Sequence, residues 1–434
     1  MFERSKKGEN ALLIQPHAGP LDEAVLEEFQ ELASSAGASI AAVVTARIDR
    51  PNAATLIGSG KLDEVRAAAE ASGADLVIVN HPLSPGQERN LERALSRRVI
   101  DRTGLILDIF AQRARSHEGK LQVELAQLRH MATRLVRGWT HLERQRGGSI
   151  GLRGPGETQL ETDRRLLQKR LEQLSKRLDK VEVQRAQMRR ARLKGELPRV
   201  ALVGYTNAGK STLFNALTGA EAYAADKLFA TLDPTVRRID LPGGGVVLAD
   251  TVGFVRDLPH ELVAAFRSTL SEAREADLLL HVVDAADPLR TERIAQVDAV
   301  LKEIGASEIP QLLVFNKIDR LEDTPPRFDR FVEERPRVWL SARDGTGLEL
   351  LHDALGQMLG LERIAGRIHL PTEAARLRGR LYEIGAIRAE RAEEDGWWLD
   401  VDLPQAEARR IAASAGGHLL APLIPEPPVE PPLG

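Results

Sequence analysis

At residues 204–211 the chain reads Gly204-Tyr205-Thr206-Asn207-Ala208-Gly209-Lys210-Ser211, which fits the phosphate-loop pattern G-x-x-x-x-G-K-[ST]. The apolar run Val200–Val203 precedes it and an apolar helical run follows, so the motif lies in the strand–loop–helix context that it requires. Glycines let backbone N–H groups close around phosphates at a helix start, where negative charge is favoured. We expect Lys210 to neutralise the β- and γ-phosphates and Ser211 to ligate Mg²⁺.

Three further motifs follow at the expected ends of later strands. Asp250-Thr251-Val252-Gly253 offers a carboxylate that can hold the magnesium ion through water and, at Gly253, an N–H for a γ-phosphate. Asn316-Lys317-Ile318-Asp319 offers an aspartate for guanine N1–H and the N2 amino group, a donor pair that adenine lacks. Ser341-Ala342 is expected to bring a backbone N–H near guanine O6. Four motifs in this order predict a GTP-binding domain.

The segment 223–235 lies between the first two motifs, where such domains keep a mobile switch with a threonine ligand for Mg²⁺. Thr231 and Thr235 both qualify, and Thr231 is preferred; the alternative for either is an ordinary strand hydroxyl. The expected nucleotide site comprises Gly204, Tyr205, Thr206, Asn207, Ala208, Gly209, Lys210, Ser211, Thr212, Phe229, Ala230, Thr231, Asp250, Thr251, Val252, Gly253, Asn316, Lys317, Asp319, Ser341, Ala342 and Arg343, with Ser211 and Thr231 as Mg²⁺ ligands and Asp250 behind them. Catalysis is assigned to Lys210, Thr231, Gly253 and Asn207.

The position after Gly253, where many small GTPases carry a water-orienting glutamine, holds Phe254, followed by Val255. Neither side chain can position or deprotonate water, so unassisted hydrolysis should be slow, roughly 10⁻³ s⁻¹ or below. Asn207 either binds a K⁺ ion that replaces an arginine finger or only caps the backbone. Arg256 either acts in cis or, as is commoner for an arginine in a switch, contacts a partner.

The N-terminal residues 1–110 alternate short apolar runs with helical patterns, which predicts a small α/β domain with a parallel sheet. Strands are expected at 11–15, 41–48, 76–80 and 105–109, and helices begin near Leu21, Lys61 and Pro85. Gly58-Ser59-Gly60-Lys61 resembles a phosphate loop, but Thr55 and Leu62 occupy the positions of the first glycine and the Ser/Thr. We interpret it as a helix start rather than a second nucleotide site.

Residues 111–194 predict a basic helical hairpin, with 21 lysine and arginine residues against 9 acidic ones in a chain whose net charge is −3. Two apolar seams alternate steps of four and three residues, the second after one longer step, and suit an antiparallel coiled coil. They are Leu121, Leu125, Leu128, Ala132, Leu135, Trp139 and Leu142, and Leu160, Leu167, Leu171, Leu174, Leu178 and Val181. Between them, residues 147–156 hold five glycines and a proline, so they form either a loop that inserts into a partner or a mobile connector. Arg144, Arg146, Gly147, Gly148, Arg153 and Gly154 are the candidate RNA contacts.

Three further parts complete the expected α/β multidomain architecture: a phosphate-loop domain at 195–362, a small α+β module at 363–421 and a proline-rich, disordered tail at 422–434. Strands of the phosphate-loop domain are expected at 200–203, 246–249, 278–283, 311–315 and 338–340. Cysteine is absent and no apolar run approaches the roughly 20 residues of a membrane span. We expect a cytoplasmic protein without a membrane anchor, and a monomer, because no heptad seam is left over for a dimer.

The motif Gly-Pro-Gly-Glu-Thr-Gln-Leu-Glu-Thr-Asp-Arg-Arg at 154–165, with residues 204–211 and Asp-Thr-Val-Gly-Phe at 250–254, resembles the HflX family of translation-factor-class GTPases. The resemblance runs from about residue 11 to residue 365. It implies binding to the large (50S) ribosomal subunit, splitting of stalled 70S ribosomes under heat stress in several members, and stimulation of GTP hydrolysis by the ribosome. It also implies that the hairpin loop approaches the peptidyl-transferase centre.

The hypothesis that follows is a ribosome-splitting and rescue factor that cycles between GTP and GDP with Mg²⁺. A large-subunit assembly checkpoint is the runner-up, because it would use the same contacts on immature particles. Regulation of a membrane protease ranks last, because no residue of the chain suggests it.

Overall fold

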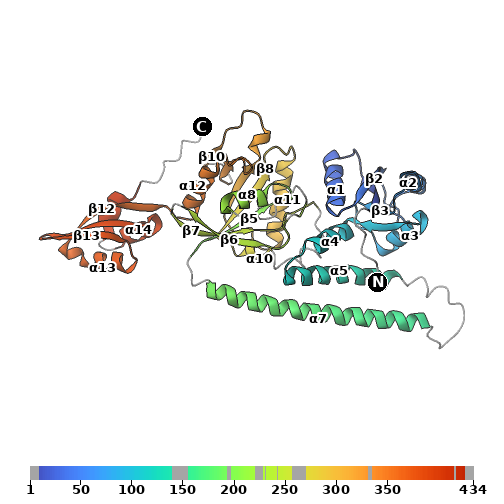
Figure 1. The fold of residues 1–434 in the computed structure, drawn as a ribbon, viewed down its shortest axis with the longest axis horizontal. Helices are drawn as coiled ribbons and strands as arrows, with labels where there is room; N and C mark the ends of the chain where they lie inside the picture. The colour runs from blue at the N-terminus through green and yellow to red at the C-terminus, as the bar shows by residue number, and fades with distance from the viewer. Residues whose placement is uncertain are drawn as a thin grey trace. The chain divides into compact units, whose positions relative to one another are not determined.

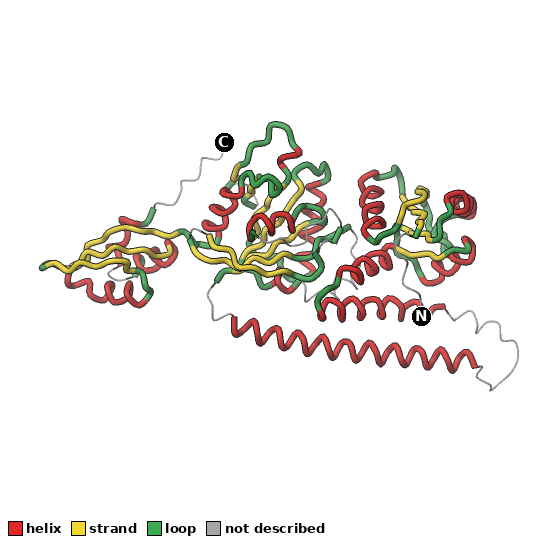
Figure 2. The backbone as a smooth tube through the Cα atoms, viewed as in Figure 1, coloured by secondary structure: helices red, strands yellow, loops and turns green. Residues whose placement is uncertain are grey.

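The computed structural model describes residues 9–138, 155–192, 197–219, 228–229, 231–241, 243–256, 270–330, 335–414 and 417–425 (Figure 2). Contacts divide the chain into two compact units. The first unit contains Met1–Gly195, Tyr223–Pro234 and Thr251–Ser271, and the second contains Glu196–Ala222, Thr235–Asp250 and Glu272–Gly434. Two short segments from the middle of the phosphate-loop domain therefore pack with the N-terminal part of the chain.

The first unit is built on a four-stranded parallel sheet in the order β2-β1-β3-β4 (Figure 1). Its strands are β1 (Asn10–His17), β2 (Ser39–Arg47), β3 (Leu76–Val79) and β4 (Arg98–Asp101), and its helices are α1 (Glu23–Ser35), α2 (Ser59–Ser72), α3 (Pro85–Leu95) and α4 (Arg102–Arg113). Apolar residues of α2 and α3 pack on one face of the sheet, whereas α1 and α4 pack against each other. The predicted α/β domain with a parallel sheet is confirmed.

Two predictions for the N-terminal domain, the strand at 105–109 and the helix start at 58–61, have different outcomes. The strand predicted at 105–109 is wrong, because these residues form the middle of α4 and the fourth strand is β4, just before it. The Asp101 side chain accepts the Gly104 N–H at 2.8 Å and starts this helix, and the apolar run is buried almost all round, so it lacks a helical polar face. The segment 58–61 is confirmed as a helix start, since Gly58 is the N-cap residue of α2.

The predicted hairpin consists of α5 (His117–Gly138) and α7 (Pro155–Arg192), which lie side by side and run in opposite directions (Figure 1). Leu121, Leu125, Leu174 and Leu178 form a buried cluster with Leu128 and Leu171 packed against it, which confirms both seams at these positions. Pro155 and Gly156, predicted in the loop, belong to the first turn of α7, where proline is tolerated. Residues 139–154, with the candidate RNA contacts, lie outside the described part.

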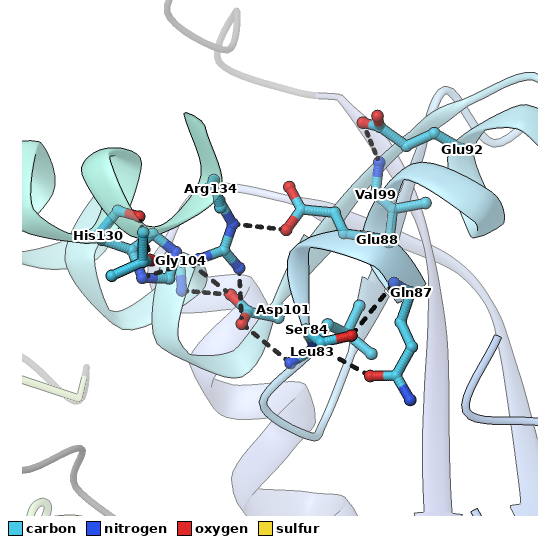
Figure 3. A network of polar contacts seen from close by, with 11 residues as sticks. Leu83, Ser84, Gln87, Glu88, Glu92, Val99, Asp101, Gly104, His130 and Arg134 are labelled. Atoms are coloured by element: carbon cyan, nitrogen blue, oxygen red, sulfur yellow. Dashed lines mark hydrogen bonds and ion pairs between the residues drawn. The ribbon is translucent and has the colours of Figure 1, made fainter. Parts of the chain in front are cut away.

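A partly buried polar network fastens α5 to the sheet (Figure 3). Arg134 on α5 donates to Glu88 on α3 at 2.6 Å and to Asp101 at the end of β4 at 2.9 Å. His130, one turn earlier, lies with its Nε2 3.7 Å from the Asp101 carboxylate. Burial and the neighbouring Arg134 lower the pKa of His130 to about 4, against the opposing effect of Asp101. The hairpin is therefore tied to the N-terminal domain at its first helix.

The second unit contains a seven-stranded sheet in the order β10-β11-β9-β8-β5-β7-β6 (Figure 1). The strands are β5 (Arg199–Gly204), β6 (Thr235–Leu241), β7 (Gly244–Asp250), β8 (Leu278–Asp284), β9 (Gln311–Asn316), β10 (Arg327–Asp329) and β11 (Arg337–Trp339), and the main helices are α8 (Lys210–Thr218), α11 (Arg290–Glu303) and α12 (Leu348–Met358). A four-residue helix, α10, spans Ser271–Arg274. The five predicted strands form the parallel centre, and the sequence analysis missed the two antiparallel edge strands, β6 and β10.

The C-terminal module has an antiparallel sheet in the order β12-β14-β13. Its elements are β12 (Arg363–Pro371), α13 (Ala375–Glu383), β13 (Ile387–Glu393), β14 (Gly396–Pro404) and α14 (Gln405–Ala412). A 3₁₀ segment at Gly417–Leu423 adds the buried Leu420 to its core and includes Pro422, where the disordered tail was predicted to begin. The remaining tail residues 426–434 lie outside the described part.

Candidate nucleotide site

The phosphate loop, residues 204–211, follows β5 and leads into α8 in a conformation that only its glycines allow. Gly204 has φ 147° and Gly209 has φ 92°. A side chain at Gly204 would overlap the backbone oxygen of Val282 on β8, and one at Gly209 would overlap the Asn316 amide. The loop is thus folded tightly between two neighbouring strands, with its backbone available to approach a ligand closely.

Lys210 lies at the start of α8, and its side chain turns back over the loop. Its Nζ donates to the carbonyl oxygens of Gly204 at 3.1 Å and Tyr205 at 2.7 Å. Burial lowers the pKa of Lys210 to about 8, and the nearby carboxylate of Asp250 opposes this shift, whereas Lys317 adds to it. A phosphate group at the loop would supply the negative charge that this buried ammonium group lacks.

Ser211, in the first turn of α8, faces Asp250 at the end of β7. The Ser211 hydroxyl donates to Asp250 Oδ2 at 2.8 Å, and Asp250 is 1% exposed. A hydroxyl and a carboxylate at hydrogen-bonding distance are a donor set that suits Mg²⁺, which prefers oxygen ligands and keeps several waters. The residues present therefore fit the expected metal, with Ser211 as the direct ligand and Asp250 behind it.

The Asn316 side chain connects three of the predicted motifs. Its Nδ2 donates to the Ala208 carbonyl at 3.0 Å, and its Oδ1 accepts the Ala342 N–H at 2.9 Å. The Ala342 N–H that was expected near guanine O6 thus has an intramolecular partner in this structure. Lys317, at φ 68°, donates to the Asn207 carbonyl at 2.6 Å and to Asp284 at 2.7 Å.

Asp319 presents its carboxylate at the surface, next to Ser341. The Ser341 hydroxyl donates to Asp319 Oδ1 at 2.8 Å. This arrangement orients the carboxylate while Asp319 remains exposed, as base recognition requires. Asp284, which pairs with Lys317, was not among the predicted residues. Its place at the end of β8, where the other motifs also follow strands, was the available signal.

Other predicted residues of the second unit lie around this loop. Thr206 and Ala208 are buried within it, Arg293 stacks on the Tyr205 ring at 4.0 Å, Thr212 is half-buried on α8 and Arg343 is exposed. Thr235 is the first residue of β6 and pairs with Asp250, so it is a strand residue.

The predicted switch segment, as far as Pro234, belongs to the first unit and is called the first switch segment below. The residues from Thr251 to Arg256 belong to the same unit and are called the second switch segment. Phe229 is buried edge-on against Phe110 of α4 at 4.6 Å, and Ala230 is not among the described residues. Thr231 follows in a half-buried loop segment. Thr251, Val252, Gly253, Phe254 and Val255 are all buried. The structure therefore places the phosphate loop in one unit and Thr231 and Gly253 in the other.

Arg256 closes the second switch segment. Its carbonyl accepts a hydrogen bond from Arg102 at 2.8 Å, and its guanidinium lies 3.7 Å from Asp22. Arg102 is itself buried and pairs with Glu28 at 2.7 Å. These contacts favour the interpretation of Arg256 as a structural or partner-contacting residue over a catalytic one.

Three family models match the chain in succession. The model described as GTP-binding GTPase N-terminal matches residues 23–111, that of the GTP-binding GTPase Middle Region matches 113–192, and that described as 50S ribosome-binding GTPase matches 199–317. Among the described residues, none of the helices has the length and apolar character needed to cross a membrane.

Curated relatives match over almost the whole length. The chain is 58% identical to the GTPase HflX of Escherichia coli (strain K12) over 415 residues, which cover 95% of this chain and 97% of that protein. It is 48% identical to the GTPase HflX of Caldanaerobacter subterraneus subsp. tengcongensis over 397 residues, 91% of each. A solved structure of a GTP-binding protein from Sulfolobus solfataricus in complex with GDP aligns at 26% identity and a TM-score of 0.45, covering 81% of this chain and 98% of that chain. Identity of this extent over nearly the full chain shows that it belongs to the HflX family and is a GTPase.

Proposed function

We propose that this GTPase binds the large ribosomal subunit, is stimulated by it, and splits or rescues stalled ribosomes. The match of residues 199–317 to the 50S ribosome-binding GTPase model carries the proposal.

We also propose the roles of the site residues. Lys210 and the phosphate loop hold the β- and γ-phosphates, Ser211 and Thr231 ligate Mg²⁺ in front of Asp250, and Asp319 selects guanine. Gly253 contacts the γ-phosphate and orders the second switch segment when GTP is bound. Their geometry supports these roles at the phosphate loop, where Ser211, Asp250 and Lys210 already lie together.

Catalytic help must come from outside the second switch segment. Phe254 is 1% exposed and offers no group that can orient water. Asn207 has φ 61°, and its carbonyl accepts Lys317, so its backbone is fixed by the loop while its side chain remains the candidate K⁺ ligand. The large subunit is the other candidate source.

The hairpin is the proposed RNA-binding element. Arg164, Arg165 and Lys169 on α7 are exposed, with Gln168 and Glu172 beside them. Arginine and lysine side chains on an exposed helix suit RNA phosphates, and binding should weaken steeply with salt. The candidate RNA contacts between α5 and α7 in the sequence are proposed to reach deeper into the ribosome; they are Arg144, Arg146, Gly147, Gly148, Arg153 and Gly154.

The first test is GTP hydrolysis in K⁺ buffer with and without purified 50S subunits. Stimulation of about ten-fold or more supports a ribosomal source of catalytic help. A high basal rate that disappears when Na⁺ replaces K⁺, without stimulation by 50S subunits, would instead identify Asn207 and a K⁺ ion as that source.

The splitting activity is tested by sedimentation of vacant 70S ribosomes with the protein and GTP or a non-hydrolysable analogue. Conversion to subunits supports the proposal. A response confined to precursor particles would show an assembly checkpoint instead. Splitting with the analogue would further show that hydrolysis serves recycling.

A further inference from the structure

The N-terminus of α5, the first helix of the hairpin, is completed by a residue more than a hundred positions away in the sequence. Ser116 is the N-cap residue, and its hydroxyl accepts the Gly119 N–H at 2.8 Å. Asp233 Oδ2 accepts the N–H groups of Arg115 and Ser116, each at 2.7 Å. Asp233 Oδ1 accepts the Ser116 hydroxyl at 2.5 Å. One carboxylate thus binds three donors at the start of a helix, where negative charge is favoured.

Gly119 supports the same contact independently. A glycine in the first turn of a helix lowers its stability relative to alanine, so its presence there needs a reason. A methyl group at this position would overlap Asp233 Oδ1. The glycine therefore leaves the space that the carboxylate occupies.

A second anchor lies on the other side of Thr231. Phe229 has φ 56°, a left-handed conformation that is costly for a bulky side chain, and it is 2% exposed against Phe110. The Leu228 N–H donates to Ser35 Oγ at 3.2 Å. Thr231 lies two residues after Phe229 and two residues before Asp233, so its Cα is within about 7 Å of each anchor.

We propose that Asp233 is the positioning residue of the first switch segment. Held by the start of α5, its carboxylate sets the place of Thr231 and so the readiness of that hydroxyl to ligate the magnesium ion of bound GTP. The inference rests on the proposed role of Thr231. It gives α5, and with it the basic hairpin, a direct connection to the segment that carries the proposed metal ligand Thr231.

The test uses the full-length protein without ribosomes and measures dissociation constants for GDP and for a non-hydrolysable GTP analogue in Mg²⁺. Asp233→Ala removes the carboxylate. Gly119→Ala displaces it while raising the helix propensity of α5, so a shared effect cannot come from a weaker helix. Ser84→Ala is the matched control, because it removes the N-cap of α3, which accepts the Gln87 N–H, from the same unit.

We expect Asp233→Ala and Gly119→Ala to lower the affinity for the GTP analogue about five-fold or more. In these variants Thr231 is no longer held in place beforehand, so binding itself must order it, at a cost in free energy. In both variants the affinity for GDP should stay within about two-fold of the wild type. Ser84→Ala should change the affinity for neither nucleotide. Chelating Mg²⁺ should remove the difference between the wild type and Asp233→Ala, because Thr231 acts through the metal.

Equal losses for both nucleotides, no change, or tighter binding of the analogue by Asp233→Ala would overturn the proposal. Thr231→Ala separates the two levels of the argument. If Thr231→Ala lowers the affinity for the analogue while Asp233→Ala does not, the assignment of Thr231 as a metal ligand is correct and the positioning role of Asp233 is wrong. If Thr231→Ala has no effect either, both assignments fail.

Discussion

The buried ammonium group of Lys210 predicts that nucleotide affinity depends on pH in a range where few other groups titrate. Burial lowers the pKa of Lys210 to about 8 in the protein without nucleotide. Phosphates at the loop favour the charged form and raise this pKa again, so binding takes up a proton above pH 8. At pH 7 the free protein is about nine-tenths protonated at Lys210 and at pH 8.5 about one quarter, so GDP affinity should fall about four-fold between them.

The assay is a titration with fluorescent GDP at constant ionic strength and saturating Mg²⁺, at several pH values from 7 to 8.5. Lys210→Met is the control, because it removes the titrating group: its affinity should be lower but independent of pH over this range. A flat profile in the wild type, or the same slope in Lys210→Met, would show that the proton uptake does not occur at Lys210.

Four further outcomes are expected. Asp319→Asn should shift preference from guanosine to xanthosine nucleotides, measured by competition; unchanged GDP affinity would contradict the assignment of base recognition. Replacing residues 147–156 with a short Gly-Ser turn should leave GTP binding intact and abolish 70S splitting, and full activity would make the segment a passive connector. Arg102→Ala should lower the free energy of unfolding by about 3–5 kcal/mol, because it leaves Glu28 buried without its 2.7 Å partner; in denaturant melts, Arg102→Ala with Glu28→Ala should recover part of that loss. The depressed pKa of His130, about 4, means that the folded state binds its proton less readily than the unfolded chain. Its stabilising contribution is therefore complete above pH 6.5 and falls by about 1.5 kcal/mol between pH 6.5 and 5, a loss that should shrink in His130→Asn.

The sequence predicted those parts of the fold whose patterns are local. The five central strands around the phosphate loop and the Leu121–Leu178 seam follow from apolar runs and heptad spacing, and both are confirmed. The run at 105–109 was misassigned because a short, fully apolar segment is equally compatible with a buried strand and a buried helix. The decisive residue was Asp101, whose capping of α4 is a single side-chain contact.

The candidate site also contains residues that local motifs predict and residues that only tertiary contacts reveal. The phosphate loop and the Asn316–Asp319 motif can be recognised from their residue spacing. The structure brings Lys210, Ser211, Asp250 and Asn316 together. Asp233 could not be found in this manner, since its partners, Arg115 and Ser116, are 118 and 117 residues away. Nor does the sequence reveal that the switch segments pack with the N-terminal unit, because that depends on tertiary contacts of Phe229 and Arg256.

The length of α7 gives the hairpin a mechanical property. Its 38 residues extend about 57 Å at 1.5 Å per residue. A tilt of about 5° at one end therefore moves the other end by about 5 Å, close to the pitch of one helical turn. If α7 stays straight, a small rotation near Ser116, where α5 begins, would be magnified along its length. A rod shorter by two heptads would span about 21 Å less, and the same tilt would move its far end by about a third less.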